Sequence, residues 1–333
     1  MTSEHRADFL ILSADVIHTA LPLAECIELM THTMAAVSDG KAQLPLRSVM
    51  PISGGPNLLG VMPGALTAPE ALGAKLVCVF PGNSARGLSS HTGAVVLFDP
   101  LTGQLRALLD AAAITSLRTP AATAAASRAL ARSDAGDLAI LGTGEQALVH
   151  LQALAIVHKL RRIRVWGRSR DKALAWSERA KSLCDVHVEV HDNVSSAVHG
   201  ADLICTTTAS SEPVLKGAWV SAGAHINLVG ASVQSASEID VDGVQRARYF
   251  VDYRPSALAQ AGELKRAMES GAVTADHIVG EIGAVHLGRC VGRGDRDDIT
   301  IYKSLGSAAQ DLATAHAVYQ AARRTGLGTA ATL

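Results

Sequence analysis

The hydrophobic positions between residues 137 and 166 follow a strand, helix, strand pattern. Residues 138–141 are an uninterrupted apolar run, as in a parallel strand that is covered on both faces. A helix is predicted over about 146–158, and a second buried strand follows at 163–166. Further strands in the same alternation are predicted at 186–190, 201–208, 225–230 and 249–252. This order predicts an α/β fold with a doubly wound sheet.

The hydrophobic pattern before residue 111 differs from that of this sheet. Residues 21–40 carry apolar side chains at helical spacing. Antiparallel strands are then predicted from alternating apolar runs and turn residues at 45–50, 57–66, 71–80, 95–99 and 104–110. The final helix, 308–322, is expected to return to this part of the chain. We therefore predict an α+β substrate-binding domain of residues 1–117 and 307–333, and a nucleotide-binding domain of residues 118–306.

Residues 111–131 are alanine-rich and helical in pattern, with an interruption at the predicted domain boundary. Arg118, Thr119 and Pro120 stand at that interruption. Proline is favoured in the first turn of a helix, so we expect a new helix to begin there. Arg118 and Thr119 would then lie at a helix start, where anions bind.

Few charges occur within the apolar strands of the first domain. Arg47 and Lys75 are the two cations in the middle of such runs, and burying either without a partner is costly. They either face solvent or meet an anionic substrate. The glycine- and serine-rich segment 81–93 is expected to be a long loop, and it carries His91 and Thr92 at its end.

The first strand of the doubly wound sheet runs into a G-x-G-x-x-A motif. Its residues are Gly142, Thr143, Gly144, Glu145, Gln146 and Ala147. Gly142 permits the tight turn, Gly144 lets a pyrophosphate approach the backbone, and Ala147 lets helix and strand pack closely. An ordinary glycine-rich turn is the alternative, but the strand and helix on either side favour a dinucleotide-binding Rossmann domain.

The residues after the second strand bear on which dinucleotide binds. A carboxylate there would accept the 2′-hydroxyl of NAD(H), but the chain has Arg168, Ser169 and Arg170, which suit a 2′-phosphate. Either arginine alone is compatible with a solvated loop charge, and Asp171 is the only nearby acid in the sequence. We predict a preference for NADP(H), with NAD(H) as the other candidate cofactor.

Composition excludes several other classes of protein. The 333 residues carry 30 basic and 31 acidic side chains, so nucleic acid and membrane surfaces are not expected partners. No targeting segment is recognised at the N-terminus, and a cytoplasmic location is expected. His187 and His191 lack a third ligand, so no metal site is predicted. The five cysteines are read as reduced packing residues: Cys26, Cys78, Cys184, Cys205 and Cys290.

Together these motifs resemble the ornithine cyclodeaminase and mu-crystallin family over nearly the whole chain. The stretches that carry the likeness are the Arg47 strand, Lys75, Ser90-His91, Ala113 to Ala122, GTGEQA, HINLVGAS and TIYKSLG. The resemblance implies a homodimer whose first domains join in a shared core built from strands. It also implies that Arg47, Lys75, His91 and Arg118 bind the substrate. The residues that it implies around the nicotinamide and its phosphates are Thr92, Arg118, Thr119, Thr206, Thr207, Val229 and Gly230.

One position distinguishes the subfamilies. Cyclodeaminases and related alanine dehydrogenases resemble each other in an aspartate two residues after Gly230, where this chain has Ser232. A serine cannot serve as a carboxylate base. Lys303 also stands where cyclodeaminases look acidic. The chain therefore resembles the mu-crystallin-like ketimine reductases better.

The resulting expectation is an NAD(P)H-dependent reductase of small cyclic ketimine carboxylates, which would yield proline or pipecolate. Arg47, Arg118 and Lys75 would act in catalysis, with Ser232 beside them. One alternative is an ornithine cyclodeaminase or an alanine-type amino-acid dehydrogenase. Another is a non-catalytic mu-crystallin-like binding protein.

Overall fold

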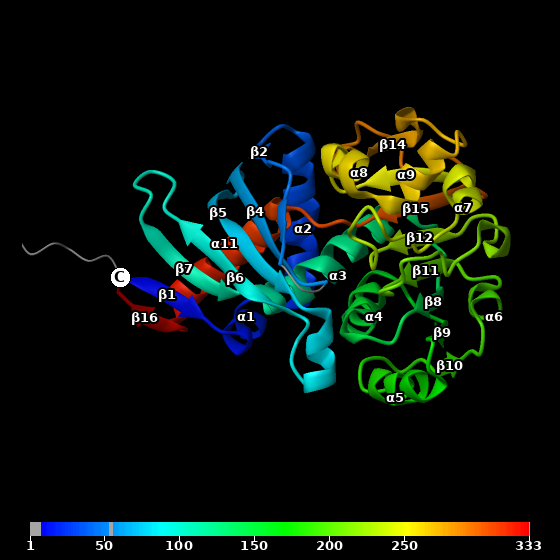
Figure 1. The fold of residues 1–333 in the computed structure, drawn as a ribbon, viewed down its shortest axis with the longest axis horizontal. Helices are drawn as coiled ribbons and strands as arrows, with labels where there is room; N and C mark the ends of the chain where they lie inside the picture. Colours follow the sequence, from blue (N-terminus) through cyan, green and yellow to red (C-terminus); the bar gives the residue numbers. More distant parts are fainter. Residues whose placement is uncertain (1–7, 53–55, 333) are drawn as a thin grey trace, which may run out of the picture. The chain divides into compact units, whose positions relative to one another are not determined.

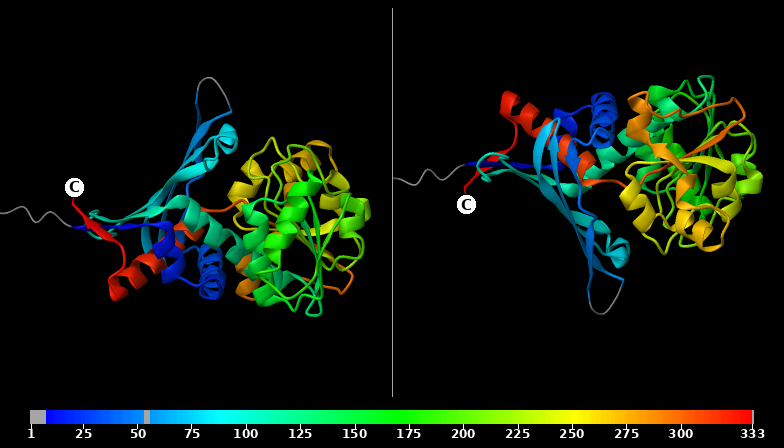
Figure 2. Two further views of the ribbon diagram at one scale, coloured as in Figure 1. Left: turned by 90° about the horizontal axis from the view of Figure 1, so that it is seen from below. Right: turned by 90° about the horizontal axis from the view of Figure 1, so that it is seen from above.

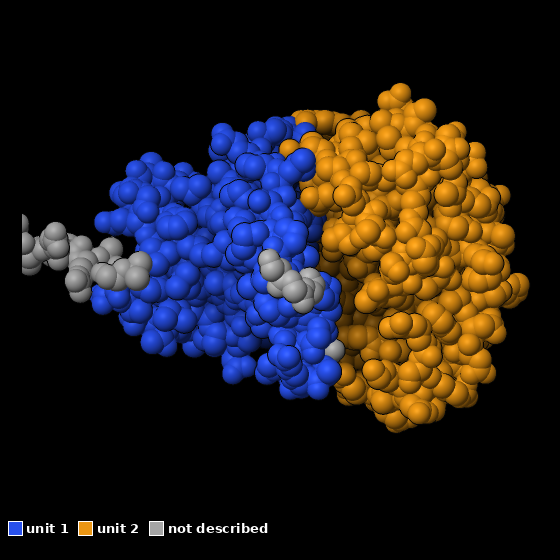
Figure 3. Space-filling model, viewed as in Figure 1, with its two compact units in different colours: residues 1–118, 307–333 blue, residues 119–306 orange. Residues whose placement is uncertain are grey.

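The computed structural model describes residues 8–52 and 56–332. The chain forms two compact units, which Figures 1 and 3 show: unit 1 consists of residues 1–118 and 307–333, and unit 2 of residues 119–306. In the described part of the chain, the helices are all too short or too polar to cross a membrane.

Unit 2 contains an eight-stranded parallel sheet in the order β10-β9-β8-β11-β12-β15-β13-β14. Its strands are β8 (Asp137–Leu141), β9 (Arg162–Trp166), β10 (Val188–Val190), β11 (Leu203–Thr206), β12 (His225–Leu228), β13 (Ala247–Val251), β14 (Ile278–Glu281) and β15 (Ile299–Lys303). The predicted doubly wound Rossmann sheet is confirmed, although β14 and β15 were not predicted as strands.

Helices cover both faces of this sheet and explain why β8 shows no polar alternation. Leu138 and Ile140 pack into one core with α4 and α5, whereas Ala139 and Leu141 pack into a second core on the other face. The helices of unit 2 are α4 (Glu145–Val157), α5 (Arg170–Ala180), α6 (Val194–Val198), α7 (Val241–Arg246), α8 (Arg254–Gln260), α9 (Gly262–Glu269) and α10 (Ile282–His286), with short 3-10 turns η2 (Gly217–Trp219) and η3 (Ala275–His277).

Unit 1 is an α+β layer built on a second sheet, in the order β16-β1-β7-β6-β5-β4-β2, with β3 paired to β4. Its strands are β1 (Phe9–Leu12), β2 (Ala42–Gln43), β3 (Ser48–Pro51), β4 (Leu58–Thr67), β5 (Glu70–Val79), β6 (His91–Phe98), β7 (Leu105–Asp110) and β16 (Thr329–Ala331). Its helices are α1 (Ala14–Ala20), α2 (Leu23–Ser38) and α11 (Ala308–Thr325). Helix α11 packs across β4, β5 and β6 and against α2, so these helices gather on one face of the sheet (Figure 2).

The structure corrects two expectations about the segments near the domain boundary. Helix α3 (Ala111–Leu130) runs without a break through Pro120, so Arg118 and Thr119 lie within a helix rather than at its start. An interior proline costs about 3 kcal/mol, but Thr119 and Ala121 are 7% and 0% exposed, and tertiary packing of these turns outweighs that cost. The segment 81–93 is also not a plain loop, because it contains the 3-10 helix η1 (Pro81–Arg86) and the start of β6.

Candidate functional site

Lys75 lies in the middle of β5, on the face of the sheet that α11 covers. Only 4% of the residue is exposed. Its Nζ donates to Thr115 Oγ1 at 3.0 Å and to Asp311 Oδ1 at 3.1 Å. Lys75 is therefore a buried, ion-paired cation, and the solvent-facing alternative is excluded.

Arg118 reaches the same carboxylate from α3. Its Nε donates to Asp311 Oδ1 at 2.9 Å, and its Nη1 donates to Gln310 Oε1 at 2.9 Å. Asp311 is completely buried, and one of its oxygens serves two cations. A guanidinium has five N–H donors, so donors remain for an anion after these bonds are made.

The electrostatics of this cluster favour a bound anion. Burial lowers the pKa of Lys75 from 10.5 to about 8; Asp311 opposes this shift, while the charges of Arg118 and Arg47 add to it. Burial by itself would raise the pKa of Asp311, but Arg118 and Lys75 hold it below its usual value. Two cations, Lys75 and Arg118, paired with one carboxylate leave an excess of positive charge.

The other residues predicted to line the site differ in how they are placed relative to Lys75. The charge of Arg47 acts on Lys75, so the two belong to one electrostatic neighbourhood. His91 begins β6 and contacts Ser90 Oγ through Nδ1 at 2.9 Å; desolvation and the charge of Lys75 lower its pKa. Thr92 pairs with Cys78 and lies on the opposite face of the sheet from Lys75, so unit 1 does not bring these two together.

The turn from β8 to α4 has the geometry of a dinucleotide-binding turn. Gly142 has a φ of +125°, and a Cβ there would lie 2.6 Å from Thr207 Oγ1, so this position requires glycine. Gly144 caps α4 and has open space where a Cβ would stand. Protein packing thus does not demand Gly144, whereas close approach of a pyrophosphate would. Gln146 Oε1 is buried without a hydrogen-bond partner among the described residues, which also fits a polar ligand.

Two of the remaining residues of the motif, Ala147 and Thr143, have packing contacts in this turn. Ala147 is fully buried against the sheet. Thr143 packs on Gly167, where a Cβ would lie 2.5 Å from Thr143 Cγ2. Glu145 is exposed in the first turn of α4. These contacts hold the end of β9 beside the β8–α4 turn.

At the end of β9, the two predicted phosphate-binding arginines differ. Arg168 is exposed and forms no hydrogen bond or ion pair with the described residues. Ser169 caps α5 and accepts from the backbone N–H of Lys172 at 3.3 Å, so its own hydroxyl proton stays available. Arg170 instead pairs with Asp192, which follows β10. Asp171 is therefore not the only acid near this turn.

Sequence reasoning missed the group that organises the carboxyl edge of the sheet. The fully buried carboxylate of Glu238 accepts from Thr206 Oγ1 at 2.7 Å and from both N and Oγ1 of Thr208, at 2.7 and 2.8 Å. It also accepts from the backbone N–H groups of Gly230 and Ala231, at 2.6 and 3.2 Å. Burial raises the pKa of this carboxyl, although its hydrogen-bond donors favour the ionised form. Glu238 thereby ties the end of β11 to the turn after β12.

The predicted residues at this edge lie around that carboxylate. Thr207 Oγ1 donates to Leu141 O at 3.4 Å, and Val229 is 9% exposed. Lys303 is completely buried, donates to the carbonyl of Ala231 and pairs with Glu263 at 2.7 Å. Ser232 is half-buried and forms no hydrogen bond with the described residues, so nothing there replaces the missing carboxylate.

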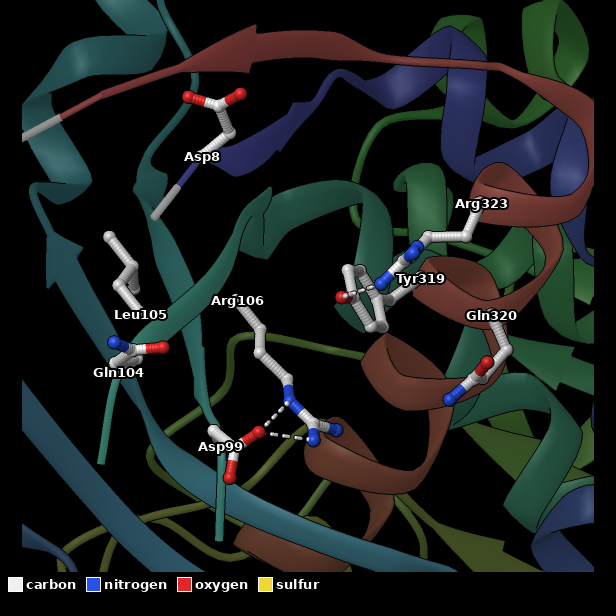
Figure 4. A pocket seen from close by; sticks show the side chains of 8 residues that line it. All are labelled: Asp8, Asp99, Gln104, Leu105, Arg106, Tyr319, Gln320 and Arg323. Carbon is white, nitrogen blue, oxygen red and sulfur yellow. Dashed lines mark hydrogen bonds and ion pairs between the residues drawn. The ribbon is translucent and has the colours of Figure 1, made fainter. Parts of the chain in front are cut away.

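Unit 1 also contains a polar pocket, whose lining residues Figure 4 shows. In this pocket Arg106 pairs with Asp99, and Arg323 donates to Tyr319 Oη at 3.3 Å. None of the predicted site residues lines it. Among the described residues, no group of three or more potential ligands is placed to hold a metal ion.

Comparison with known proteins identifies the family of this chain. The family model "Ornithine cyclodeaminase/mu-crystallin family" matches residues 8–326. The chain belongs to this family. Ketimine reductase mu-crystallin from Mus musculus is 38% identical over 281 residues, which cover 84% of this chain and 86% of the mouse protein.

Two solved structures are also similar to this chain. Delta(1)-pyrroline-2-carboxylate reductase from Thermococcus litoralis, in complex with NADH and L-proline, has a TM-score of 0.94 and 31% identity, covering 96% of this chain and 99% of that one. An archaeal alanine dehydrogenase dimer with bound NAD has a TM-score of 0.92 and 30% identity, covering 98% and 100%. The names of these two proteins give different activities, so the choice among activities rests on individual residues.

Proposed function

We propose that this protein is an NAD(P)H-dependent reductase of small cyclic ketimine carboxylates, such as pyrroline-2-carboxylate and piperideine-2-carboxylate. The observation that carries the proposal is the buried pair of Lys75 and Arg118 on a single carboxylate oxygen, with donors left over for an anion. The reductases named among its relatives support it.

In this proposal, the substrate carboxylate is bound by the remaining guanidinium donors of Arg118 together with Arg47. Bidentate guanidinium geometry suits a planar carboxylate. Lys75, with a pKa of about 8, is mostly protonated at neutral pH and keeps the imine nitrogen protonated, directly or through a water. A protonated imine is the stronger electrophile at carbon.

The cofactor fits the residues of unit 2. When bound, the reduced nicotinamide supplies a hydride to the imine carbon, and the imine nitrogen keeps its proton, which leaves a cyclic amino acid. The open space at Gly144 and the N-terminus of α4 suit the pyrophosphate. Arg168 and the hydroxyl of Ser169 favour NADP(H) over NAD(H).

Direct assay distinguishes the candidate functions. We expect NADPH to be oxidised when a cyclic ketimine carboxylate is added, and no ammonia to be released from ornithine or alanine. Ammonia release without imine reduction would favour the cyclodeaminase or alanine-type dehydrogenase. Nucleotide binding without any turnover would favour a non-catalytic binding protein.

Replacing Ser232 by alanine tests the choice of subfamily. Ser232 forms no hydrogen bond with the described residues, so its removal should cost no more than a neutral hydrogen bond, about 0.5–1.5 kcal/mol. Imine reduction should therefore fall no more than roughly tenfold in kcat/KM. A loss of several orders of magnitude would show that the serine hydroxyl is itself the proton donor.

The second face of the sheet in unit 1 supports a homodimer. Alternate residues of β4, β5 and β6 point away from α11, and these are mostly apolar: Val61, Pro63, Leu72, Ala74, Val96 and Phe98. In the described part of unit 1, the helices α2 and α11 lie together on the other face (Figure 2). We propose that a second copy covers this apolar face.

A charge on that face should therefore disrupt the dimer. In light scattering after size exclusion, Leu72→Glu is expected to give a monomer where the natural protein gives a dimer. Ile156→Glu is the matched control, because Ile156 is 50% exposed on α4 of unit 2. A dimeric Leu72→Glu variant would place the interface elsewhere.

A further inference from the structure

Asp311 occupies an unusual electrostatic position in unit 1. It is completely buried, and its Oδ1 accepts from both Lys75 Nζ and Arg118 Nε. Its Oδ2 is buried without a hydrogen-bond partner among the described residues. The two cations that offset the cost of burying this carboxylate therefore both bind the same oxygen. The charges of the three side chains are strongly coupled as a result.

The helix that carries Asp311 is suited to hold an anion in one place. Asp311 lies in the first turn of the 18-residue helix α11, where the helix dipole stabilises negative charge. Neighbouring Gln310 accepts a second bond from Arg118, so α11 supports the guanidinium at two points. Helix α11 itself packs across β5, which carries Lys75.

Resting on the proposed function, we propose that Asp311 is a positioning residue, which holds the Lys75 ammonium and the Arg118 guanidinium in the arrangement that receives the substrate. Asp311 needs no contact with substrate for this role. It acts by removing the freedom of two long cationic side chains before binding, so that less is lost when the substrate carboxylate arrives.

Asp311 also governs the protonation of Lys75. The charged or titratable groups that act on Lys75 are Asp311 on α11, Arg118 on α3, Arg47 before β3 and His91 on β6; the buried thiol of Cys26 on α2 lies near Arg118. Among these, Asp311 is the group that raises the pKa of Lys75. Without it, burial and two neighbouring arginines would all favour neutral lysine.

An Asp311→Asn variant tests this role through the pH profile of imine reduction. Removing an opposite charge at this distance should lower the pKa of Lys75 by about 1–3 units. The alkaline limb of kcat/KM should move down by that amount from about pH 8, and kcat/KM at pH 8 should fall by roughly 5- to 500-fold. A purely structural role would lower activity without moving the limb. An unmoved limb in a folded variant would overturn the proposal.

Two further variants keep the test decisive. Asp311→Glu keeps the charge but displaces it. We therefore expect the alkaline limb of kcat/KM to stay where it is in the natural protein, and KM to rise roughly tenfold. Asp99→Asn is the matched control, because Asp99 also pairs with an arginine of unit 1 and does not contact Lys75 or Arg118; its profile should not change. If Asp311→Asn does not fold, a natural KM in Asp311→Glu overturns the proposal. Failure of both variants to fold would assign Asp311 to folding instead.

Calorimetry separates this proposal from the proposed function. Pyrrole-2-carboxylate is a planar ring carboxylate whose binding requires no turnover. If the natural protein binds it but reduces no imine, the proposed function fails while the role of Asp311 remains testable. Asp311→Asn should then weaken binding more at pH 8 than at pH 6, and equal affinities at both pH values would contradict the role of Asp311.

Discussion

A Lys75→Met variant is expected to lose roughly 10²- to 10⁴-fold in kcat/KM for cyclic imine reduction, the range ascribed to a positioned proton donor. Methionine retains the length and apolar character of the lysine stem, so the packing of β5 against α11 is largely preserved. Binding of NADPH should remain close to normal, because the motif of unit 2 does not depend on this side chain. Steady-state kinetics and nucleotide titration measure the two effects.

We expect the pH dependence of imine reduction to identify protonated Lys75 as the active form. Lys75 has its pKa lowered to about 8, so the charged fraction falls as the pH rises through that value. The natural protein should lose kcat/KM above about pH 8, and Lys75→Met should lack this limb. Lys41→Met is the control, since Lys41 is an exposed lysine of unit 1 that pairs with Asp39. A full alkaline limb in Lys75→Met would assign the titration to another group.

The unit of β8, α4 and β9 could be predicted because its signals are local. Three signals lie within 30 residues of sequence: an apolar run, glycines at fixed spacing and a helical pattern. Each of them indicates the same structure. Pro120 is the opposite case. Its local preference points to a helix start, but the buried contacts on both sides of it keep α3 continuous.

The partners in the site could not be predicted in the same way, because long-range contacts create them. Asp311 meets Lys75 across 236 positions of sequence, and Glu238 meets Thr206 across 32. One usable signal existed for Asp311: a carboxylate in an alanine-rich helix with apolar neighbours requires a buried partner, as Lys75 does. Glu238 had no such signal, since it stands in a serine-rich stretch that reads as a solvated loop.

Asp192 shows how one such contact changes a prediction about the cofactor. The sequence presents Arg168 and Arg170 as equivalent cations on either side of Ser169. Pairing with Asp192 gives Arg170 an anion already, so a 2′-phosphate must compete for it. Arg168 has no such competitor among the described residues, and the larger share of any preference for NADPH falls to it.

An Arg168→Ala variant should therefore weaken the binding of NADPH roughly 10- to 150-fold, which corresponds to a charge-assisted contact of about 1.5–3 kcal/mol. Binding of NADH should barely change, because NADH has no 2′-phosphate. Arg170→Ala is expected to have a smaller effect, since Asp192 already pairs with this arginine and offsets its charge. Arg179→Ala, in the last turn of the same helix α5, is the matched control and should alter neither affinity. Fluorescence titration with both nucleotides measures the ratio, and equal losses for NADPH and NADH in Arg168→Ala would exclude this turn as the 2′-phosphate site.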